Sequence, residues 1–403
     1  MALQSAAVGL RIVDVCEFYA ERGGGVKTYA HDKLAAGARG GHDIVILAPD
    51  DSASERELHG GRLVTIPEPK LPVDRRYHMF VSTRRIHAAL DRLQPDVIEA
   101  SSPYLAAHAV ASYAGGRAKT LVFHQDPIAV YPHTLLDRFI ARDTLDRAFN
   151  PYWSYMRKLS QSYDATVTSG EWLAKRLHGL GLHAPVAVPF GIDKARFDPA
   201  QRDPSVRAQW LARCGAPDDA ALIVAVGRHH PEKRLHVVIN AVQHAIGASA
   251  RAGVQRPIAL VLIGDGPLRK LVELWSRKLK HVCVAGFVSD RALVAATLAS
   301  ADAVLHASAA ETYGLSVAEA ICSGTPVVVP DSGGASDLAD PSYSETYVTG
   351  DAISAADALT RLLNRDRDAL RFACATTGRA RIARSSQHFD GLFALYTQLA
   401  SKS

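Results

Sequence analysis

The sequence has 403 residues, which is more than one ordinary hydrophobic core accommodates and favours two domains. Hydrophobic residues make up 48% and charged residues 22%, proportions that are typical of a globular protein and exclude a disordered chain. The formal net charge of +5 fits an anionic ligand or membrane surface. No zinc-finger spacing, RNP-like motif or Lys/Arg-rich run indicates nucleic acid as a partner.

The five cysteines are widely spaced and form no CxxC motif, so we expect a reducing compartment and no disulfide framework. The first residues lack the pattern of a signal peptide, and no stretch approaches the roughly 18 apolar residues of a membrane-spanning helix. We therefore expect a cytoplasmic protein whose only membrane contact would be peripheral, at the inner face.

The first half of the chain alternates strand-like apolar runs with helical patterns. The expected strands are Arg11–Val15, Asp43–Ala48, Leu63–Ile66, Val97–Ala100, Leu121–His124, Ala165–Ser169 and Pro185–Val188. Helical patterns such as Lys27–Ala38 and Ser82–Leu93 lie between most of them. This alternation predicts parallel strands joined by crossover helices.

The stretch Val188–Ala200 has two prolines, a glycine and no periodicity, so we interpret it as a domain linker. Apolar runs typical of doubly buried parallel strands follow at Ala221–Val226, Ile258–Ile263, His281–Ala285, Ala303–His306 and Pro326–Val329. Helices are expected between them at Lys233–Ile246, Pro267–Leu279, Asp290–Ser300 and Leu315–Ser323, with an amphipathic helix at His388–Leu399. Ligands of such sheets bind at the carboxyl ends of the strands, so the turns there are the candidate sites.

One such turn places two carboxylates near a helix N-terminus. Glu311 precedes a helix that starts near Gly314, and Glu319 lies inside it. The free amides at Tyr313, Gly314 and Leu315 suit a diphosphate, and the carboxylates suit sugar and ribose hydroxyls. The alternative is that both carboxylates only support the helix electrostatically.

A second turn, VGRHHPEKR, follows a buried strand and brings Arg228 and Lys233 to a helix start, where both can bind a leaving diphosphate. A solvated basic loop is the alternative. The adjacent histidines lack a carboxylate or thiol at ligand spacing, so no metal site is expected there. The turn IGDGP is expected to have a structural role. The backbone of the turn at Phe287 could face a nucleobase.

The first half has two further candidates. Gly24 and Gly25 follow the first strand, and consecutive glycines let the backbone approach a ligand closely, although a flexible turn is equally simple. His124 ends a strand at the expected binding edge, where a buried, hydrogen-bonded histidine is the alternative.

Together these segments resemble the retaining glycosyltransferases of family 4 with the GT-B fold. The clearest signature is the E-x7-E pattern from Glu311 to Glu319, within ETYGLSVAE. The supporting motifs GGGV, VGR…EK, IGDGP and VAGFVS occur in the family's order and cover most of the chain.

The resemblance implies an α/β protein with two Rossmann-like domains facing across a deep cleft. It implies an N-terminal acceptor-binding domain (1–195), a C-terminal nucleotide-sugar-binding domain (196–384) and a C-terminal helix (385–403) that crosses back to the first domain. The activity would be transfer of a hexose, with retention, from a UDP- or GDP-linked sugar to an acceptor hydroxyl of a lipid, glycan precursor or small molecule.

The resemblance also implies residue roles. Arg228 and Lys233 would bind the diphosphate, Glu311 the sugar hydroxyls and Glu319 the ribose. His124 would lie near the reaction centre. The remaining donor contacts would come from Gly24, Gly25, Tyr313, Gly314 and Leu315, while Phe287 is expected at the nucleobase from its turn alone. Lys27 and Tyr29 stand where the family varies with the acceptor. From their charge, Arg75 or Arg76 is expected to bind a phosphate or carboxylate of the acceptor.

No cofactor or divalent metal is expected, because the cationic groups already meet the leaving diphosphate. The arginine-rich segment Asp74–Leu93 could lie on an anionic bilayer or could be an ordinary solvated helix. A GT-B-fold epimerase and a non-catalytic nucleotide-sugar-binding protein are the alternatives, whereas the missing dinucleotide fingerprint disfavours a dehydrogenase.

Overall fold

The computed structural model describes residues 9–21, 25–72, 74–251, 256–277 and 279–402. Contacts divide the chain into two units. Unit 1 combines Met1–His124, Phe149–Pro189 and Ser386–Ser403, and unit 2 combines Gln125–Ala148 with Phe190–Ser385. The segment Gln125–Ala148, which the sequence analysis assigned to the first domain, is therefore grouped by its contacts with the second.

Unit 1 is built on a sheet of eight strands in the order β3-β4-β2-β1-β5-β6-β7-β8. All neighbouring strands are parallel except β3 and β4, which form a hairpin at one edge. The strands are β1 (Arg11–Val15), β2 (Asp43–Asp50), β3 (Ser54–Leu58), β4 (Gly61–Pro67), β5 (Val97–Ala100), β6 (Ala118–Phe123), β7 (Ala165–Thr168) and β8 (Pro185–Ala187).

Helices α1 (Gly25–Arg39) and α16 (Ser385–Ala400) share one hydrophobic cluster with the sheet of unit 1. Leu34 of α1 packs there with Phe389 and Phe393 of α16, although α16 lies at the opposite end of the chain. The remaining helices of this unit are α2 (Thr83–Leu93), α3 (Leu105–Ser112), α6 (Asn150–Ser160) and α7 (Glu171–Gly179).

Unit 2 contains a wholly parallel sheet of six strands in the order β12-β11-β10-β13-β14-β15. The central strands have continuous apolar sequences, because helices cover both faces of the sheet. The strands are β10 (Ala221–Val226), β11 (Ile258–Ile263), β12 (Val282–Gly286), β13 (Ala303–Leu305), β14 (Val327–Pro330) and β15 (Ser344–Tyr347).

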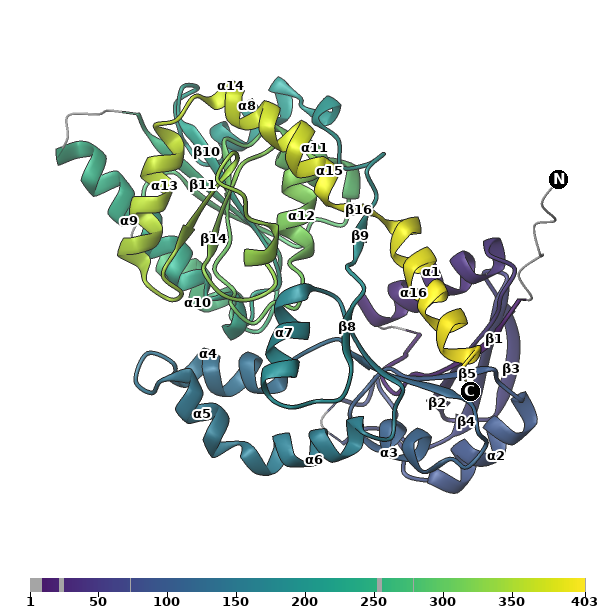
Figure 1. Ribbon diagram of the computed structural model, residues 1–403. Coiled ribbons are helices and arrows are strands. Elements are labelled where there is room, and N and C mark those ends of the chain that lie inside the picture. Colours follow the sequence, from purple (N-terminus) through teal and green to yellow (C-terminus); the bar gives the residue numbers. More distant parts are fainter. Residues whose placement is uncertain (1–8, 22–24, 73, 252–255, 278, 403) are drawn as a thin grey trace. The chain divides into compact units, whose positions relative to one another are not determined.

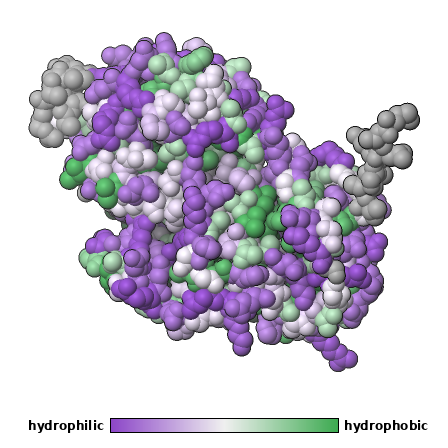
Figure 2. Space-filling view, in the orientation of Figure 1, coloured by the Kyte–Doolittle hydropathy of each residue, from purple (hydrophilic) through white to green (hydrophobic). Residues whose placement is uncertain are grey.

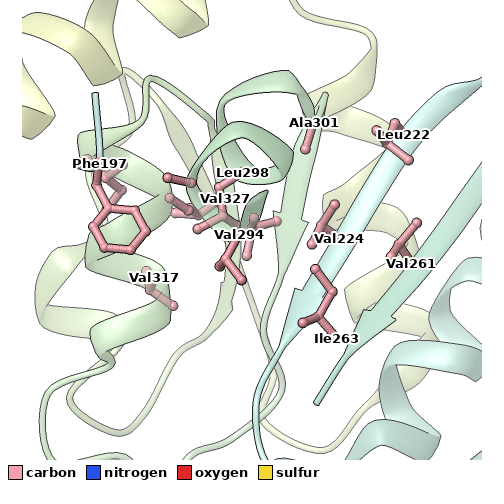
Figure 3. Packing of buried hydrophobic residues seen from close by; sticks show 14 of the residues in the cluster. Phe197, Leu222, Val224, Val261, Ile263, Val294, Leu298, Ala301, Val317 and Val327 are labelled. Atoms are coloured by element: carbon pink, nitrogen blue, oxygen red, sulfur yellow. The ribbon is translucent and has the colours of Figure 1, made fainter. Parts of the chain in front are cut away.

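Alternate side chains of these strands enter two separate cores. Leu222 and Val224 of β10 belong to one cluster with Val294 of α11 (Arg291–Ser300) and Val317 of α12 (Leu315–Cys322) (Figure 3). Ile223 and its neighbours face α9 (Leu235–Arg251) and α13 (Ala352–Leu363). The two helix pairs cover opposite faces of the sheet (Figure 1).

Short elements complete unit 2. The helices are η1 (Ala129–His133), α4 (Thr134–Leu136), α5 (Arg142–Ala148), η2 (Pro199–Gln201), α8 (Pro204–Arg213), η3 (Pro231–Lys233), α10 (Arg269–Ser276), η4 (Ser336–Leu338), α14 (Arg367–Ala373), η5 (Cys374–Gly378) and α15 (Arg379–Arg381). The strands β9 (Gly191–Ile192) and β16 (Ala383–Arg384) pair in parallel, so the expected linker is partly strand.

Helix α2 carries the arginines that suggested a bilayer contact. Its apolar residues Ile86, Leu90 and Leu93 are buried within unit 1, so only the polar face with Arg84 is exposed. No helix in the part of the chain that the structure describes is long and apolar enough to cross a membrane. The face drawn in Figure 2 is largely hydrophilic, with hydrophobic residues in scattered patches.

A buried lysine ties α1 and α16 to the sheet of unit 1. The ammonium of Lys33 is fully buried and forms ion pairs with Asp14 of β1, at 3.1 Å, and with Glu99 of β5. The hydroxyl of Tyr396, from α16, donates a hydrogen bond to Glu99. Because a buried charge is tolerated only when it is paired, these contacts fix how both helices pack on the strands.

We expect Tyr396→Phe to lower the free energy of unfolding by about 1.5–3 kcal/mol, the range for a hydrogen bond to a charged group. The measurement is urea unfolding, with Tyr155→Phe as the control, because Tyr155 is partly exposed and its hydroxyl has no hydrogen-bond partner among the described residues. Equal unfolding midpoints for both variants would contradict the role given to Tyr396.

Candidate functional site

The turns that follow β10, β12 and β13 carry the candidate donor-binding residues of unit 2. Arg228 and Lys233 follow β10, Phe287 follows β12, and Glu311 follows β13. The strands are parallel members of one sheet, in which β13 neighbours β10 and β11 separates β10 from β12, so their carboxyl ends fall at one edge.

Lys233 and Glu311 form a direct ion pair in unit 2. The imidazole Nε2 of His306, at the end of β13, lies 3.7 Å from the same carboxylate oxygen. Burial lowers the pKa of Lys233, but Glu311 outweighs it, and the net shift is upward. Burial raises the pKa of Glu311, but Lys233 and His306 outweigh it, and the net shift is downward. The pair is therefore fully charged at neutral pH.

His306 is neutral beside this ion pair. Burial lowers the pKa of His306 to about 4, and the positive charge of Lys233 contributes to this lowering. The sequence analysis did not single out His306. The only signal was its position at the carboxyl end of a buried strand, five residues before Glu311.

Helix α12 begins at Leu315, four residues after Glu311. Its N-cap is Gly314, which has φ of +94°, and there is no side-chain cap and no acidic residue in the first turn. Amides of the first turn thus have no capping group of their own and suit an anion. Leu315 is exposed at the helix start, whereas Tyr313 is buried and packs edge-on against Phe190.

The loop that carries Glu311 is held by close backbone contacts. The amide of Gly334 donates to the Glu311 carbonyl at 2.7 Å. A Cβ at Gly334 would lie 2.4 Å from the Thr312 carbonyl carbon, so no larger residue fits. Similarly, a Cβ at Gly264, in the turn IGDGP, would lie 1.9 Å from the Gly227 carbonyl oxygen, which agrees with the structural role expected of that turn.

Glu319 and Phe287 differ in their surroundings. Glu319 lies inside α12 and accepts a hydrogen bond from Arg291, 2.5 Å away, a partner that the sequence analysis missed. Burial raises the pKa of Glu319, and Arg291 opposes that rise only in part. The side chain of Phe287 is 74% exposed, so it is free to contact a planar base.

Arg228 is exposed, and its side chain has no hydrogen bond or ion pair with the described residues. It is thus a free cation on the same turn as the paired Lys233. Next to it, His229 is buried, and neither ring nitrogen has a hydrogen-bond partner in the described part of the chain. Burial lowers the pKa of His229, which favours the neutral ring.

The candidates of the first half lie in unit 1. Burial lowers the pKa of His124 to about 4, so this histidine is neutral at physiological pH. Tyr29 lies edge-on to His124, and its hydroxyl is 3.0 Å from Nε2 of His388 on α16. Lys27 donates to the Glu21 carbonyl at 2.6 Å. Gly25 opens α1, with open space where a Cβ would be, and Gly24 lies outside the described residues.

Arg75 and Arg76 line a pocket of about 750 Å³ in unit 1. Arg76 is paired with Asp74 at 2.6 Å, whereas Arg75 has no ion pair among the described residues. The other lining residues mix carboxylates with basic and hydroxyl groups: Tyr19, Ala20, Glu21, Pro49, Asp50, Asp51, Thr65, Lys70, Asp74 and His78.

Within the described residues, one cluster has the spacing of a metal site, and it lies in this pocket. It consists of Asp50, Asp51 and His78. Lys70 already pairs with Asp51 at 2.9 Å, so an ammonium supplies the positive charge there. No group with metal-ligand spacing was found among the described residues of the unit 2 site.

Comparisons with known proteins identify the family of this chain. The profile described as "Glycosyl transferases group 1" matches residues 206–381, and that described as "Glycosyltransferase Family 4" matches residues 23–196. The chain is 31% identical over 323 residues to a Mycobacterium tuberculosis "GDP-mannose-dependent alpha-(1-6)-phosphatidylinositol dimannoside mannosyltransferase", covering 79% of each chain. The chain belongs to the group 1, family 4 type of glycosyltransferases.

Two further similarities bear on this family assignment. A "GDP-mannose-dependent alpha-mannosyltransferase" of Mycobacterium tuberculosis is 28% identical over 339 residues, covering 83% of this chain and 82% of the relative. The structure of sucrose-phosphate synthase from Thermosynechococcus elongatus aligns with a TM-score of 0.72 and 17% identity over 98% of this chain and 100% of that one. The glycosyltransferase thus has the α/β GT-B fold expected from the sequence, and it transfers a sugar from a nucleotide-sugar donor.

We expect Lys233→Ala and Arg228→Ala each to lower the turnover of the glycosyltransferase by about 10²-fold or more, the scale of losing one electrostatic donor at a leaving group. The measurement is steady-state release of nucleotide from the donor. Lys270→Ala is the control, because Lys270 is an exposed lysine on α10 of the same unit. Unchanged kinetics in both site variants would remove these residues from the site.

Proposed function

We propose that this glycosyltransferase moves a hexose, with retention and without a divalent metal, from a UDP- or GDP-linked sugar to an acceptor hydroxyl. GDP-mannose is the first donor to test, because the names of the most similar relatives specify it. The observation that carries the proposal is the charged Lys233–Glu311 pair beside the uncapped start of α12.

The donor diphosphate would lie at the start of α12. Departure of the sugar leaves negative charge on the diphosphate, and fixed positive groups stabilise that charge without reorganising. Arg228 supplies a free guanidinium, Lys233 an ammonium held in place by Glu311, and α12 its first amides. These groups supply the positive charge that a metal ion provides in other transferases.

Glu311 would accept hydrogen bonds from the sugar hydroxyls with its second oxygen. Its lowered pKa keeps it a carboxylate, so it accepts rather than donates. Glu319 would bind the ribose, and its link to Arg291 orients it. In the retaining route the acceptor hydroxyl attacks from the face that the diphosphate leaves, and a phosphate oxygen takes the proton.

His124 would assist as a neutral hydrogen-bonding group. With a pKa of about 4, it carries no charge at the pH of the cytoplasm and has one donor and one acceptor nitrogen. Such a ring can hold a sugar hydroxyl but does not supply a permanent positive charge to the reaction centre.

The acceptor would bind in unit 1, at the pocket with Arg75. Carboxylates there suit the hydroxyls of a polyol, and the exposed Arg75 with Lys70 suits a phosphate. We therefore propose a polyhydroxylated acceptor with a phosphate group, which agrees with the phosphatidylinositol dimannoside in the relative's name. The enzyme would work in the cytoplasm, with Lys27 and Tyr29 shaping the acceptor side.

The donor is identified by measuring nucleotide release from UDP-, GDP- and ADP-sugars with a chelator present. We expect slow hydrolysis of one donor, with GDP-mannose the first candidate, at a rate that the chelator does not change. Loss of all activity with the chelator would overturn the metal-free route. Product analysis separates the alternatives, since an epimerase converts the donor without releasing nucleotide and a binding protein leaves it intact.

Peripheral membrane contact is tested by co-sedimentation with vesicles. The exposed basic groups Arg75 and Arg84 should each contribute on the order of 1 kcal/mol at an anionic surface. We expect binding to phosphatidylserine vesicles at low salt that Arg75→Gln combined with Arg84→Gln weakens. Equal sedimentation with and without vesicles would remove the membrane contact.

A further inference from the structure

The residue that follows Lys233 has an unusual backbone. Arg234 caps η3 in the left-handed region, with φ of +46° and ψ of 43°. That region is unfavourable for any residue with a Cβ, and glycine adopts it at little cost. Arg234 is one of five non-glycine residues with a positive φ among the described residues, so the case for a role rests on its side-chain contacts.

The side chain of Arg234 is buried and anchored. It is 6% exposed, and its guanidinium Nη2 lies 2.7 Å from Oδ2 of Asp137. The same nitrogen is 3.4 Å from the carbonyl oxygen of His133. Both partners belong to the segment Gln125–Ala148, which is part of unit 2. The ion pair thus spans 97 positions of sequence.

Asp137 is shared between two arginines. Arg142 donates to the same Oδ2 at 2.9 Å, and its other nitrogen donates to the Ser332 hydroxyl at 2.8 Å. Burial raises the pKa of Asp137, but Arg234 and Arg142 outweigh it and keep the carboxylate ionised. Asp137 therefore joins the turn after β10 to the loop after β14.

Arg234 also lines a pocket of about 640 Å³ in unit 2, together with Asp137, Trp275, Asp331 and Asp351. Among the described residues, Asp137 is the carboxylate that forms an ion pair with Arg234, so this contact anchors the guanidinium.

The two neighbours on this turn are anchored in different directions. Lys233 pairs with Glu311 after β13, and Arg234 pairs with Asp137 on the segment Gln125–Ala148. The backbone of the turn is closed by the amides of Lys233 and Arg234, which donate to the carbonyls of His230 and Pro231 at 3.0 Å. Movement of Arg234 would displace Lys233 directly, since one peptide joins them.

We propose that the Arg234–Asp137 ion pair is a positioning device that holds the turn so that the Lys233 ammonium meets Glu311 and the donor diphosphate. The inference rests on the proposed function only in naming the diphosphate as the group that Lys233 meets. Arg234 is a positioning residue, because it acts through Lys233 and does not touch the reacting atoms.

The test uses the full chain with Arg234→Gly, Arg234→Lys, Asp137→Asn and the double variant Arg234→Gly/Asp137→Asn. Glycine suits the left-handed backbone, so Arg234→Gly removes the side chain without adding strain. Arg138→Ala is the control, because Arg138 lines the same pocket and has no ion pair among the described residues.

We expect Arg234→Gly and Asp137→Asn each to lower kcat about 10-fold, a fraction of the loss from removing an electrostatic donor outright, and to raise KM for the donor, because the donor has the same diphosphate as GDP. The double variant should be no worse than Asp137→Asn alone, because Asp137→Asn already removes the ion pair with Arg234 as well as the one with Arg142. Arg234→Lys should restore part of kcat, and Arg138→Ala should match the wild type.

Binding of GDP and of GMP, measured by calorimetry, gives a readout that does not need turnover. We expect the two single variants to bind GDP about 10-fold more weakly and GMP unchanged, since only GDP has the second phosphate. UDP and UMP replace them if the wild type prefers uridine. Additive losses in the double variant, or wild-type kcat and GDP affinity in folded single variants, would overturn the positioning role.

The two proposals fail in distinguishable ways. A wild type that binds GDP or UDP but turns over no donor contradicts the proposed function, and the affinity ratios still decide the role of Arg234. If Arg234→Gly does not fold, Asp137→Asn carries the test, because it keeps the volume of the side chain. A wild type that binds no nucleotide overturns both.

Discussion

The ion pair between Lys233 and Glu311 is the interaction on which the candidate donor site of this glycosyltransferase depends. Both side chains are 19% exposed, and each partner stabilises the charge of the other, so the pair fixes the position of both groups. The pair is charged but close to neutral as a whole, and His306 beside it is uncharged. In the proposed function, the phosphate and sugar groups of a donor would meet charges already held in place, which need little rearrangement.

Unit 1 also contains a lysine that is paired with carboxylates, but there the ion pairs hold the packing of helices on the sheet. Lys33 is buried between Asp14 and Glu99 of neighbouring strands, and Tyr396 of α16 completes the cluster. Here the charges bind the first and last helices of the unit to its sheet. Because a displaced lysine would leave two carboxylates unpaired, the cluster allows one packing arrangement where purely apolar contacts would allow several.

Backbone proximity limits the residues around the donor site as strongly as charge does. The loops after β10 and β11 touch at Gly227 and Gly264, and the loops after β13 and β14 touch at Thr312 and Gly334. No Cβ fits at Gly264 or Gly334, so these glycines set the distance between neighbouring loops. The carboxyl edge of a parallel sheet is thus packed closely enough for side chains from different turns to pair.

The sequence by itself determined the fold class, because doubly buried strands such as Ala221–Val226 and Ile258–Ile263 are continuous apolar runs whose limits the structure reproduces. It missed β3, where the residues are exposed and polar. The sequence also identified the motif residues, because their side-chain chemistry and their positions near strand ends can be read locally. It did not identify their partners: Glu311 is 78 positions from Lys233, and Asp137 is 97 from Arg234. Only the tertiary structure decided these pairs, because burial and the order of strands bring together charges that no local pattern connects.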